Sequence, residues 1–184
     1  MYRICLFAVI LFVTSCTATR RNTGPDTRNT AIKSSVVLKG KVARKTINTR
    51  NTPADSLVRY AETFIGIPYK YGSAAPEKGF DCSGFIFYVF NRFKIQVPRT
   101  SAEYTNAGTE VNIKDCKRGD IILFTGSNSK SGVVGHMGII TKNKNNRIEF
   151  IHAASGDDAG VMISQMNAYF IPRFVKVNRI FKVI

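Results

Sequence analysis

Histidine and cysteine are scarce in this chain of 184 residues, which limits the metal sites that it can form. It contains two histidines and four cysteines, and none of the cysteines lies in a CxxC pair or at a zinc-ligand spacing from a histidine. Structural zinc sites usually take four closely spaced Cys and His ligands. The sequence therefore predicts no metal site.

No apolar run is long enough to cross a membrane as a helix in the mature protein. The run at residues 4–13 follows a short basic start and ends in VTSC at residues 13–16, which is similar to a bacterial lipoprotein signal. We expect residues 1–15 to be a signal peptide and Cys16 to carry lipid, which places the protein in the cell envelope, facing the periplasm or the exterior. A plain secretory signal and an incidental apolar N-terminus are the alternatives.

Acidic residues are also few: 12 Asp and Glu stand against 27 Lys and Arg, a net charge of +15. Such a charge favours a polyanionic neighbour, and export argues against nucleic acid and for acidic lipid or cell-wall polymer. Residues 16–53 carry nine basic residues and one acidic residue, and residues 17–52 contain no aromatic residue. This composition predicts a flexible basic tether, or a mere solvated spacer, ahead of a folded domain at residues 54–184.

The order of the predicted elements indicates an α+β fold. Apolar spacing predicts helices over residues 55–65, with Asp55 or Ser56 as the N-cap, and over residues 81–93. A short polar helix is expected over residues 101–107. Strands are predicted over residues 120–124, 136–141, 147–152, 161–164 and 174–183. Helices followed by strands imply an antiparallel sheet with a central helix packed on it.

Cys82 lies where a polar turn runs into the second predicted helix. Backbone N–H groups and the macrodipole at a helix start stabilise a thiolate, so we expect a lowered pKa for Cys82. His136 begins a predicted strand and supplies a candidate base, and His152 ends the next strand, where it is placed to orient that base. By themselves, these residues are also compatible with an inert core cysteine and two structural histidines.

Two cysteines remain for the mature domain, because Cys5 would leave with the signal and Cys16 would carry lipid. Cys82 and Cys116 either form one disulfide or stay unpaired. We favour two unpaired thiols.

Five motifs follow one another along the predicted domain: residues 66–72 (GIPYKYG), 79–85 (GFDCSGF), 118–124 (RGDIILF), 135–139 (GHMGI) and 151–153 (IHA). Their order and spacing closely resemble those of the NlpC/P60 family of cell-wall cysteine peptidases, and the resemblance covers residues 54–184. The resemblance implies a papain-like α+β fold in which Cys82 is the nucleophile, His136 the base and His152 the orienting residue.

Three further residues match family positions close to the nucleophile. Tyr69 matches a tyrosine that helps to form the oxyanion hole or positions the substrate, although it is equally compatible with a core aromatic. Asp81 and Ser83 match residues that line the substrate groove in some members, and Asp81 is also well placed as a helix N-cap.

The resemblance implies hydrolysis of the peptidoglycan stem peptide, most often at the γ-D-glutamyl–diaminopimelate bond, through a thioester. It implies a monomer with no metal or organic cofactor, and no regulatory partner can be named. Two alternatives stay open: an amidase or acyl transferase acting on another substrate, and a non-catalytic wall-binding lipoprotein.

Overall fold

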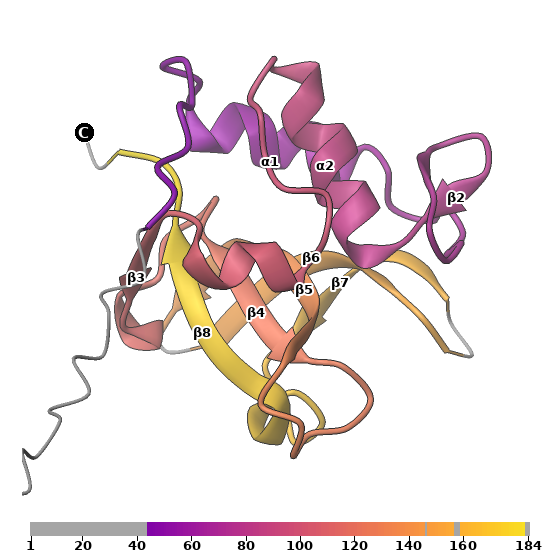
Figure 1. Cartoon of the computed structure of the whole chain (residues 1–184), viewed down its shortest axis with the longest axis vertical. Helices are drawn as coiled ribbons and strands as arrows, with labels where there is room; N and C mark the ends of the chain where they lie inside the picture. Colours follow the sequence, from indigo (N-terminus) through magenta and orange to yellow (C-terminus); the bar gives the residue numbers. More distant parts are fainter. Residues whose placement is uncertain (1–43, 146, 157–158, 183–184) are drawn as a thin grey trace, which may run out of the picture. The chain divides into compact units, whose positions relative to one another are not determined.

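Six antiparallel strands form the sheet that carries this domain, in the order β3-β8-β4-β5-β6-β7. The computed structural model describes residues 44–145, 147–156 and 159–182. The strands are β3 (Thr109–Val111), β4 (Ile121–Thr125), β5 (Val134–Lys144), β6 (Arg147–Ala154), β7 (Gly160–Gln165) and β8 (Phe174–Arg179). Helices α1 (Ala54–Glu62) and α2 (Cys82–Arg92) lie over one face of this sheet (Figure 1). The predicted α+β fold with a helix packed on an antiparallel sheet is confirmed.

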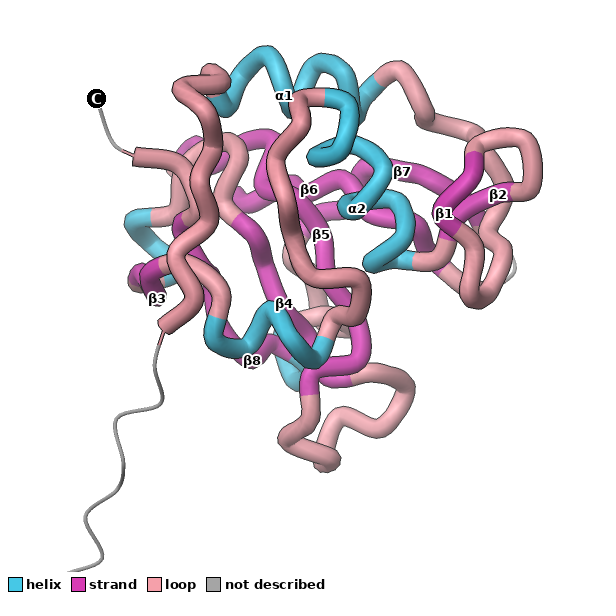
Figure 2. Tube along the Cα trace, turned by 45° about the horizontal axis from the view of Figure 1, so that its top comes forward, coloured by secondary structure: helices cyan, strands magenta, loops and turns pink. Residues whose placement is uncertain are grey.

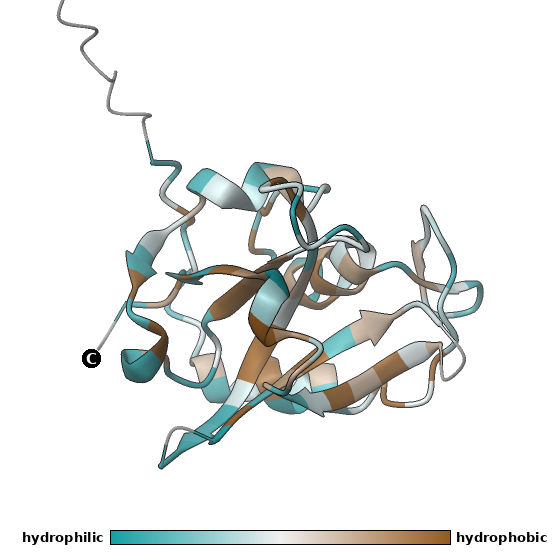
Figure 3. Cartoon of the chain, turned by 90° about the horizontal axis from the view of Figure 1, so that it is seen from below, coloured by the Kyte–Doolittle hydropathy of each residue, from teal (hydrophilic) through white to brown (hydrophobic). Residues whose placement is uncertain are grey.

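The middle of the sheet is buried on both faces. All five residues of β4 are buried, and successive side chains alternate between the two faces of the strand. Ile121 and Leu123 join the core beneath the helices, whereas Ile122 and Phe124 join a second apolar cluster on the other face. Figure 3 shows these apolar stretches along the strands. Because β4 is packed on both faces, it supports the neighbouring strand β5 rigidly.

Helix α1 differs from its prediction at both ends. It begins at Ala54 after Pro53, which provides no side-chain cap, so the expected cap at Asp55 or Ser56 is wrong. The Asp55 carboxylate instead pairs with Arg118, 2.9 Å away, far along the chain. The helix also ends at Glu62 rather than at residue 65. Asp55 therefore lies within the first turn of α1, where it pairs with Arg118 and also with Arg59 of the same helix instead of capping it.

Helix α2 matches its prediction closely, because its sequence signal is strong. Its N-cap is Asp81, and Cys82 is its first residue. A short hairpin, β1 (Ala74–Ala75) and β2 (Gly79–Phe80), leads into it and was not predicted. Figure 2 shows this hairpin beside the start of α2. Two-residue strands carry too little periodicity to be found from sequence.

Other departures occur at the sheet edge. The expected polar helix is a 3-10 helix, Ala102–Asn106, and it leads into the unpredicted edge strand β3. Strand β8 ends at Arg179, before the expected end at residue 183. Asp120, which directly precedes β4, accepts two hydrogen bonds from Arg179 at the end of β8, at 3.0 and 2.7 Å, and is almost fully buried. Asp120 therefore has a structural role, since it joins β8 to the residue that precedes β4.

The fold also extends upstream of the expected boundary at residue 54. Lys45 forms a bridge with Ala107, and Ile47 is buried in the core beneath the helices. The predicted signal, the Cys16 lipid site and the tether up to residue 43 lie outside the described residues. Within the described ranges, no helix has the length and hydropathy needed to cross a bilayer.

Candidate active site

The start of α2 places Cys82 against the first residues of β5. The Asp81 carboxylate caps the helix by accepting a hydrogen bond of 2.6 Å from the Gly84 N–H. The Cys82 side chain is the first beyond this cap, and its Sγ lies 3.9 Å from the carbonyl oxygen of Gly135. The structure thus brings the cysteine of one motif beside the Gly-His motif that is 53 residues away along the chain.

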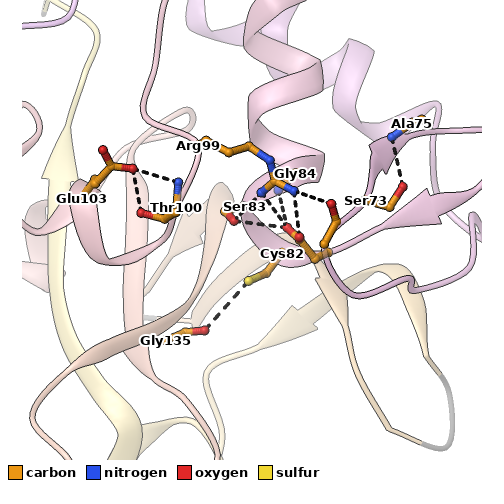
Figure 4. A network of polar contacts seen from close by, with 11 residues as sticks. Ser73, Ala75, Cys82, Ser83, Gly84, Arg99, Thr100, Glu103 and Gly135 are labelled. Carbon is orange, nitrogen blue, oxygen red and sulfur yellow. Dashed lines mark hydrogen bonds and ion pairs between the residues drawn. The ribbon is translucent and has the colours of Figure 1, made fainter.

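Asp81 and Ser83 are engaged in a buried network with Arg99 (Figure 4). Arg99 donates to both carboxylate oxygens of Asp81, at 3.1 and 2.9 Å, and to Ser83 Oγ at 3.0 Å. Burial by itself would raise the pKa of Asp81, but hydrogen bonds from Arg99 and the Gly84 N–H hold that pKa below its ordinary value. Neither Asp81 nor Ser83 lines the cleft that contains Cys82. Their predicted contact with substrate stays a prediction, and the geometry favours the capping role of Asp81.

His136 and His152 meet across neighbouring strands, as their spacing predicted. His136 Nε2 and His152 Nδ1 are 2.8 Å apart, and His152 Nε2 is 2.9 Å from Ser164 Oγ on β7. If His136 is to accept a proton at Nδ1, its other nitrogen must carry a hydrogen, and this Nε2–H donates to His152 Nδ1. The hydrogen of the neutral His152 ring is then on Nε2, which donates to Ser164 Oγ. Because a hydroxyl both donates and accepts, Ser164 Oγ is able to accept this bond, and the arrangement is compatible with the required tautomers. Ser164 had no local sequence signal, because only strand register brings it there.

Cys82, His136 and His152 line one cleft of about 400 Å³, together with Tyr69. The same cleft is also lined by Ser127, Tyr169, Phe170 and Arg173, which the sequence did not single out. The structure shows no hydrogen bond between Cys82 and His136, since the thiol bonds to the Gly135 carbonyl instead. The four predicted residues therefore share a cavity, and the thiol must leave the Gly135 carbonyl before it passes its proton to His136.

The electrostatics of the resting site differ from the expectation of a lowered thiol pKa. Burial, together with the charge of Asp81, raises the pKa of Cys82 to about 11, although the N–H groups of Ser83 and Met137 act in the opposite direction. Burial lowers the pKa of His136 to about 4. The resting pair is therefore a neutral thiol and a neutral imidazole at pH 7. The helix start does favour the thiolate, but desolvation outweighs it.

The two buried histidines make the domain sensitive to acid. In the unfolded chain each binds a proton near pH 6.5, whereas in the fold burial lowers the pKa to about 4 for His136 and about 3 for His152. Between these values the unfolded state holds more protons, so the free energy of unfolding falls as pH is lowered. We expect the free energy of unfolding to fall by up to about 1.4 kcal/mol per pH unit for each histidine. Urea unfolding between pH 7.5 and 4.5 measures this slope.

The control for this acid sensitivity is His136→Gln, which removes one titrating group and keeps a polar side chain. Its slope of unfolding free energy against pH should be shallower by about one proton. An unchanged slope in this variant would show that His136 does not titrate on unfolding as described.

Cys82 and Cys116 are both free thiols, so the prediction of unpaired cysteines is confirmed. Cys116 belongs to the apolar cluster on the sheet face away from the helices, and Asn143 Nδ2 lies 3.4 Å from its Sγ. It does not line the cleft. Cys116 therefore provides a matched control for chemistry at Cys82.

Comparison with known sequences gives a consistent result. Residues 66–179 match the NlpC/P60 family. The chain is 30% identical over 178 residues to the Escherichia coli murein DD-endopeptidase MepS/murein LD-carboxypeptidase, an alignment that covers 94% of this chain and 87% of that protein. It is 41% identical over 127 residues to the Bacillus subtilis probable peptidoglycan endopeptidase LytE, covering 67% of this chain and 33% of LytE.

Comparison with solved structures agrees. A Bacillus cereus NlpC/P60 family protein superposes with a TM-score of 0.61 at 26% identity, covering 70% of this chain and 40% of the other. The NlpC/P60 domain of the peptidoglycan hydrolase SagA superposes with a TM-score of 0.56 at 29% identity, covering 70% of this chain and 99% of that domain.

Proposed function

Because this chain belongs to the NlpC/P60 family, we propose that it is a peptidoglycan hydrolase that cuts stem peptides as a cysteine endopeptidase. The observation that carries the proposal is a buried thiol at a helix start that shares one cleft with a hydrogen-bonded histidine pair. Relatives named as murein and peptidoglycan endopeptidases support the substrate class. This combination disfavours a wall-binding role without catalysis.

In the proposed mechanism His136 takes the proton of Cys82 as sulfur attacks the peptide carbonyl. A neutral resting pair requires this transfer to accompany the attack rather than to precede it. His152, held by Ser164, stabilises the imidazolium that forms. Backbone N–H groups at the start of α2 are the nearest donors for the oxyanion, with Tyr69 beside them in the cleft.

The second half of the reaction returns the site to its starting state. The leaving amine takes its proton from His136, which leaves a thioester on Cys82. Water then attacks the thioester, His136 acts as the base, and the acid product leaves as the thiol re-forms. No metal or organic cofactor enters this sequence of steps.

Three bonds are candidates for cleavage. The first is the γ-D-glutamyl–diaminopimelate bond within one stem peptide, which the motif resemblance implies. The second and third are suggested by the Escherichia coli relative aligned over 94% of this chain, whose name gives DD-endopeptidase and LD-carboxypeptidase activities. These bonds are the cross-link between two stems and the bond to a terminal D-alanine.

The cell envelope is the proposed location, since peptidoglycan is found there and the related hydrolases act on it by name. A lipid anchor at Cys16, a signal at residues 1–15 and a basic tether over the residues before 44 stay predictions, whereas residues 44–53 of the expected tether belong to the fold. A monomeric state also stays a prediction. Metabolic labelling with a fatty-acid analogue, compared between the wild type and Cys16→Ala, tests the anchor.

A digest tests the function and identifies the bond. The detergent-solubilised full chain is incubated with purified diaminopimelate-type peptidoglycan, and the released muropeptides are read by mass spectrometry beside His136→Ala. Stems that end in γ-D-Glu identify the γ-D-glutamyl–diaminopimelate bond as the one that is cut. Monomers released from cross-linked dimers identify the cross-link, and loss of D-alanine identifies the bond to the terminal D-alanine. If folded wild-type protein releases none of these from polymer or soluble stems, the proposed function is wrong.

A further inference from the structure

Arg173 is the one formally charged side chain among the residues that line the described cleft. Burial holds His136 and His152 in their neutral forms near pH 7, so neither supplies a positive charge at rest. Among the described residues that line the cleft there is this one cation and no carboxylate, which creates a local positive field. The cleft is therefore suited to an anionic group on whatever binds there.

The guanidinium group has hydrogen-bond donors to spare. Of its five N–H donors, Nη1 donates to the Tyr169 carbonyl at 2.7 Å, and Nη2 reaches the Ser127 carbonyl only at 3.5 Å. Nε is buried and has no partner. Within the described ranges, no Asp or Glu forms a salt bridge with Arg173. The Nη donors are exposed, so a partner from outside the protein can reach them, whereas the unpartnered Nε is buried, which is rare for a polar group.

The position of this guanidinium is well determined by its neighbours. Its Cζ lies 3.9 Å from the centre of the Tyr169 ring, a stacked cation–π contact. The preceding turn is held by Asn167, whose side chain accepts from the N–H groups of Tyr169 and Phe170. The Phe170 ring in turn packs 5.7 Å from the His152 ring. Arg173 thus contacts Tyr169, and the next residue, Phe170, packs on His152, so these contacts connect the guanidinium to the histidine pair.

The sheet order places Arg173 on one side of His136 and Tyr69 on the other. Arg173 immediately precedes β8, which pairs with β4, and β4 pairs with β5 at His136. Tyr69 lies beside the start of β7, where its N–H donates to Ala159. His136 must reach the leaving amine to donate a proton, so the leaving group lies close to His136. Arg173 lines the same cleft as His136, on its β8 side.

We propose that Arg173 is a specificity residue that binds a free carboxylate on the leaving-group side of the cleaved bond. This inference rests on the proposed function and adds to it a substrate preference. The leaving group of each candidate bond is diaminopimelate or D-alanine, and either can present a free carboxylate. A planar guanidinium matches such a carboxylate with paired hydrogen bonds, and an amide in its place loses both the charge and one acceptor.

The test compares two versions of one substrate. The full chain is assayed on a stem peptide whose leaving residue carries a free carboxylate, and on the same peptide with that carboxylate amidated, at the bond found in the digest. We expect the wild type to favour the carboxylate by about 10- to 100-fold in kcat/KM. Arg173→Met should lose this preference through a higher KM for the acid, with kcat and the amide substrate changed less than about threefold.

Two further variants separate recognition from folding and from general charge. Arg173→Lys keeps the charge without the planar fork and should retain part of the preference. Lys130→Met removes an exposed positive charge from the loop between β4 and β5 and should leave the preference intact. A thermal melt of each variant verifies the fold.

The possible results are distinct. A wild type that hydrolyses both peptides equally well overturns the inference and leaves the proposed function in place. The inference is also overturned, with the proposed function left in place, if Arg173→Met slows hydrolysis of both substrates equally. It is likewise overturned if Lys130→Met loses the preference for the carboxylate as Arg173→Met does. A folded wild type that hydrolyses neither peptide overturns the proposed function, and this inference with it.

Discussion

Cys82→Ala is expected to reduce kcat/KM for stem-peptide hydrolysis by at least about 10⁴-fold, because it removes the one thiol among the described residues that line the cleft. The fold should survive, since the change deletes one sulfur atom from a position next to a cavity. Circular dichroism and urea unfolding check the fold, and muropeptide release under single-turnover conditions measures the loss.

Cys116→Ala is the matched control, because Cys116 is a free, buried thiol that lies away from the cleft. It should keep nearly full activity. Cys82→Ser tests the same point with a hydroxyl, which is a far weaker nucleophile at neutral pH. Substantial activity in Cys82→Ser or Cys82→Ala would contradict a thioester mechanism, whereas equal losses in the Cys82 and Cys116 variants would indicate a structural effect.

Gly84→Ala is expected to destabilise the domain by about 2–3 kcal/mol and to lower activity with it. A Cβ on Gly84 would lie 2.1 Å from the backbone oxygen of Ser73 and 3.0 Å from Asp81 Oδ1. That Ser73 oxygen accepts the Asp81 N–H at 3.0 Å, and the Asp81 side chain caps α2. Relieving the clash must therefore shift the start of the helix that carries Cys82.

Gly126→Ala provides the comparison for this effect. A Cβ there meets nothing closer than 3.8 Å, so its unfolding free energy should change by less than about 0.5 kcal/mol. Urea unfolding of both variants gives the two values. A Gly84→Ala protein as stable as the wild type would mean that the hairpin before α2 yields easily, and the rigid placement of Cys82 would then be in doubt.

Local signals in the sequence predicted much of the site. The Asp-Cys-Ser-Gly motif predicted the start of α2 because capping and helix initiation depend on neighbouring residues. The 16-residue spacing of His136 and His152 predicted their contact, because adjacent antiparallel strands joined by a short turn bring such positions together. These interactions are local or follow from one hairpin, so a linear pattern carries them.

Long-range packing decided the rest. Ser164, Arg99 and Arg173 reach the site through strand register and tertiary contact, and no short motif marks them. The pKa of Cys82 is raised rather than lowered because burial depends on what packs around the helix start. Likewise, Asp55 does not cap α1 and instead forms an ion pair with Arg118, which the fold brings to it from far along the chain.

The sequence by itself determined the α+β class, the helix that presents Cys82 and the identity of its histidine partners, because each depends on short-range periodicity or on one strand pairing. Only the tertiary structure decided the protonation of the resting site, the contact of Ser164 with His152 and the position of Arg173 in the cleft. Desolvation and charge placement depend on atoms contributed by many distant segments, and a linear pattern does not contain their distances.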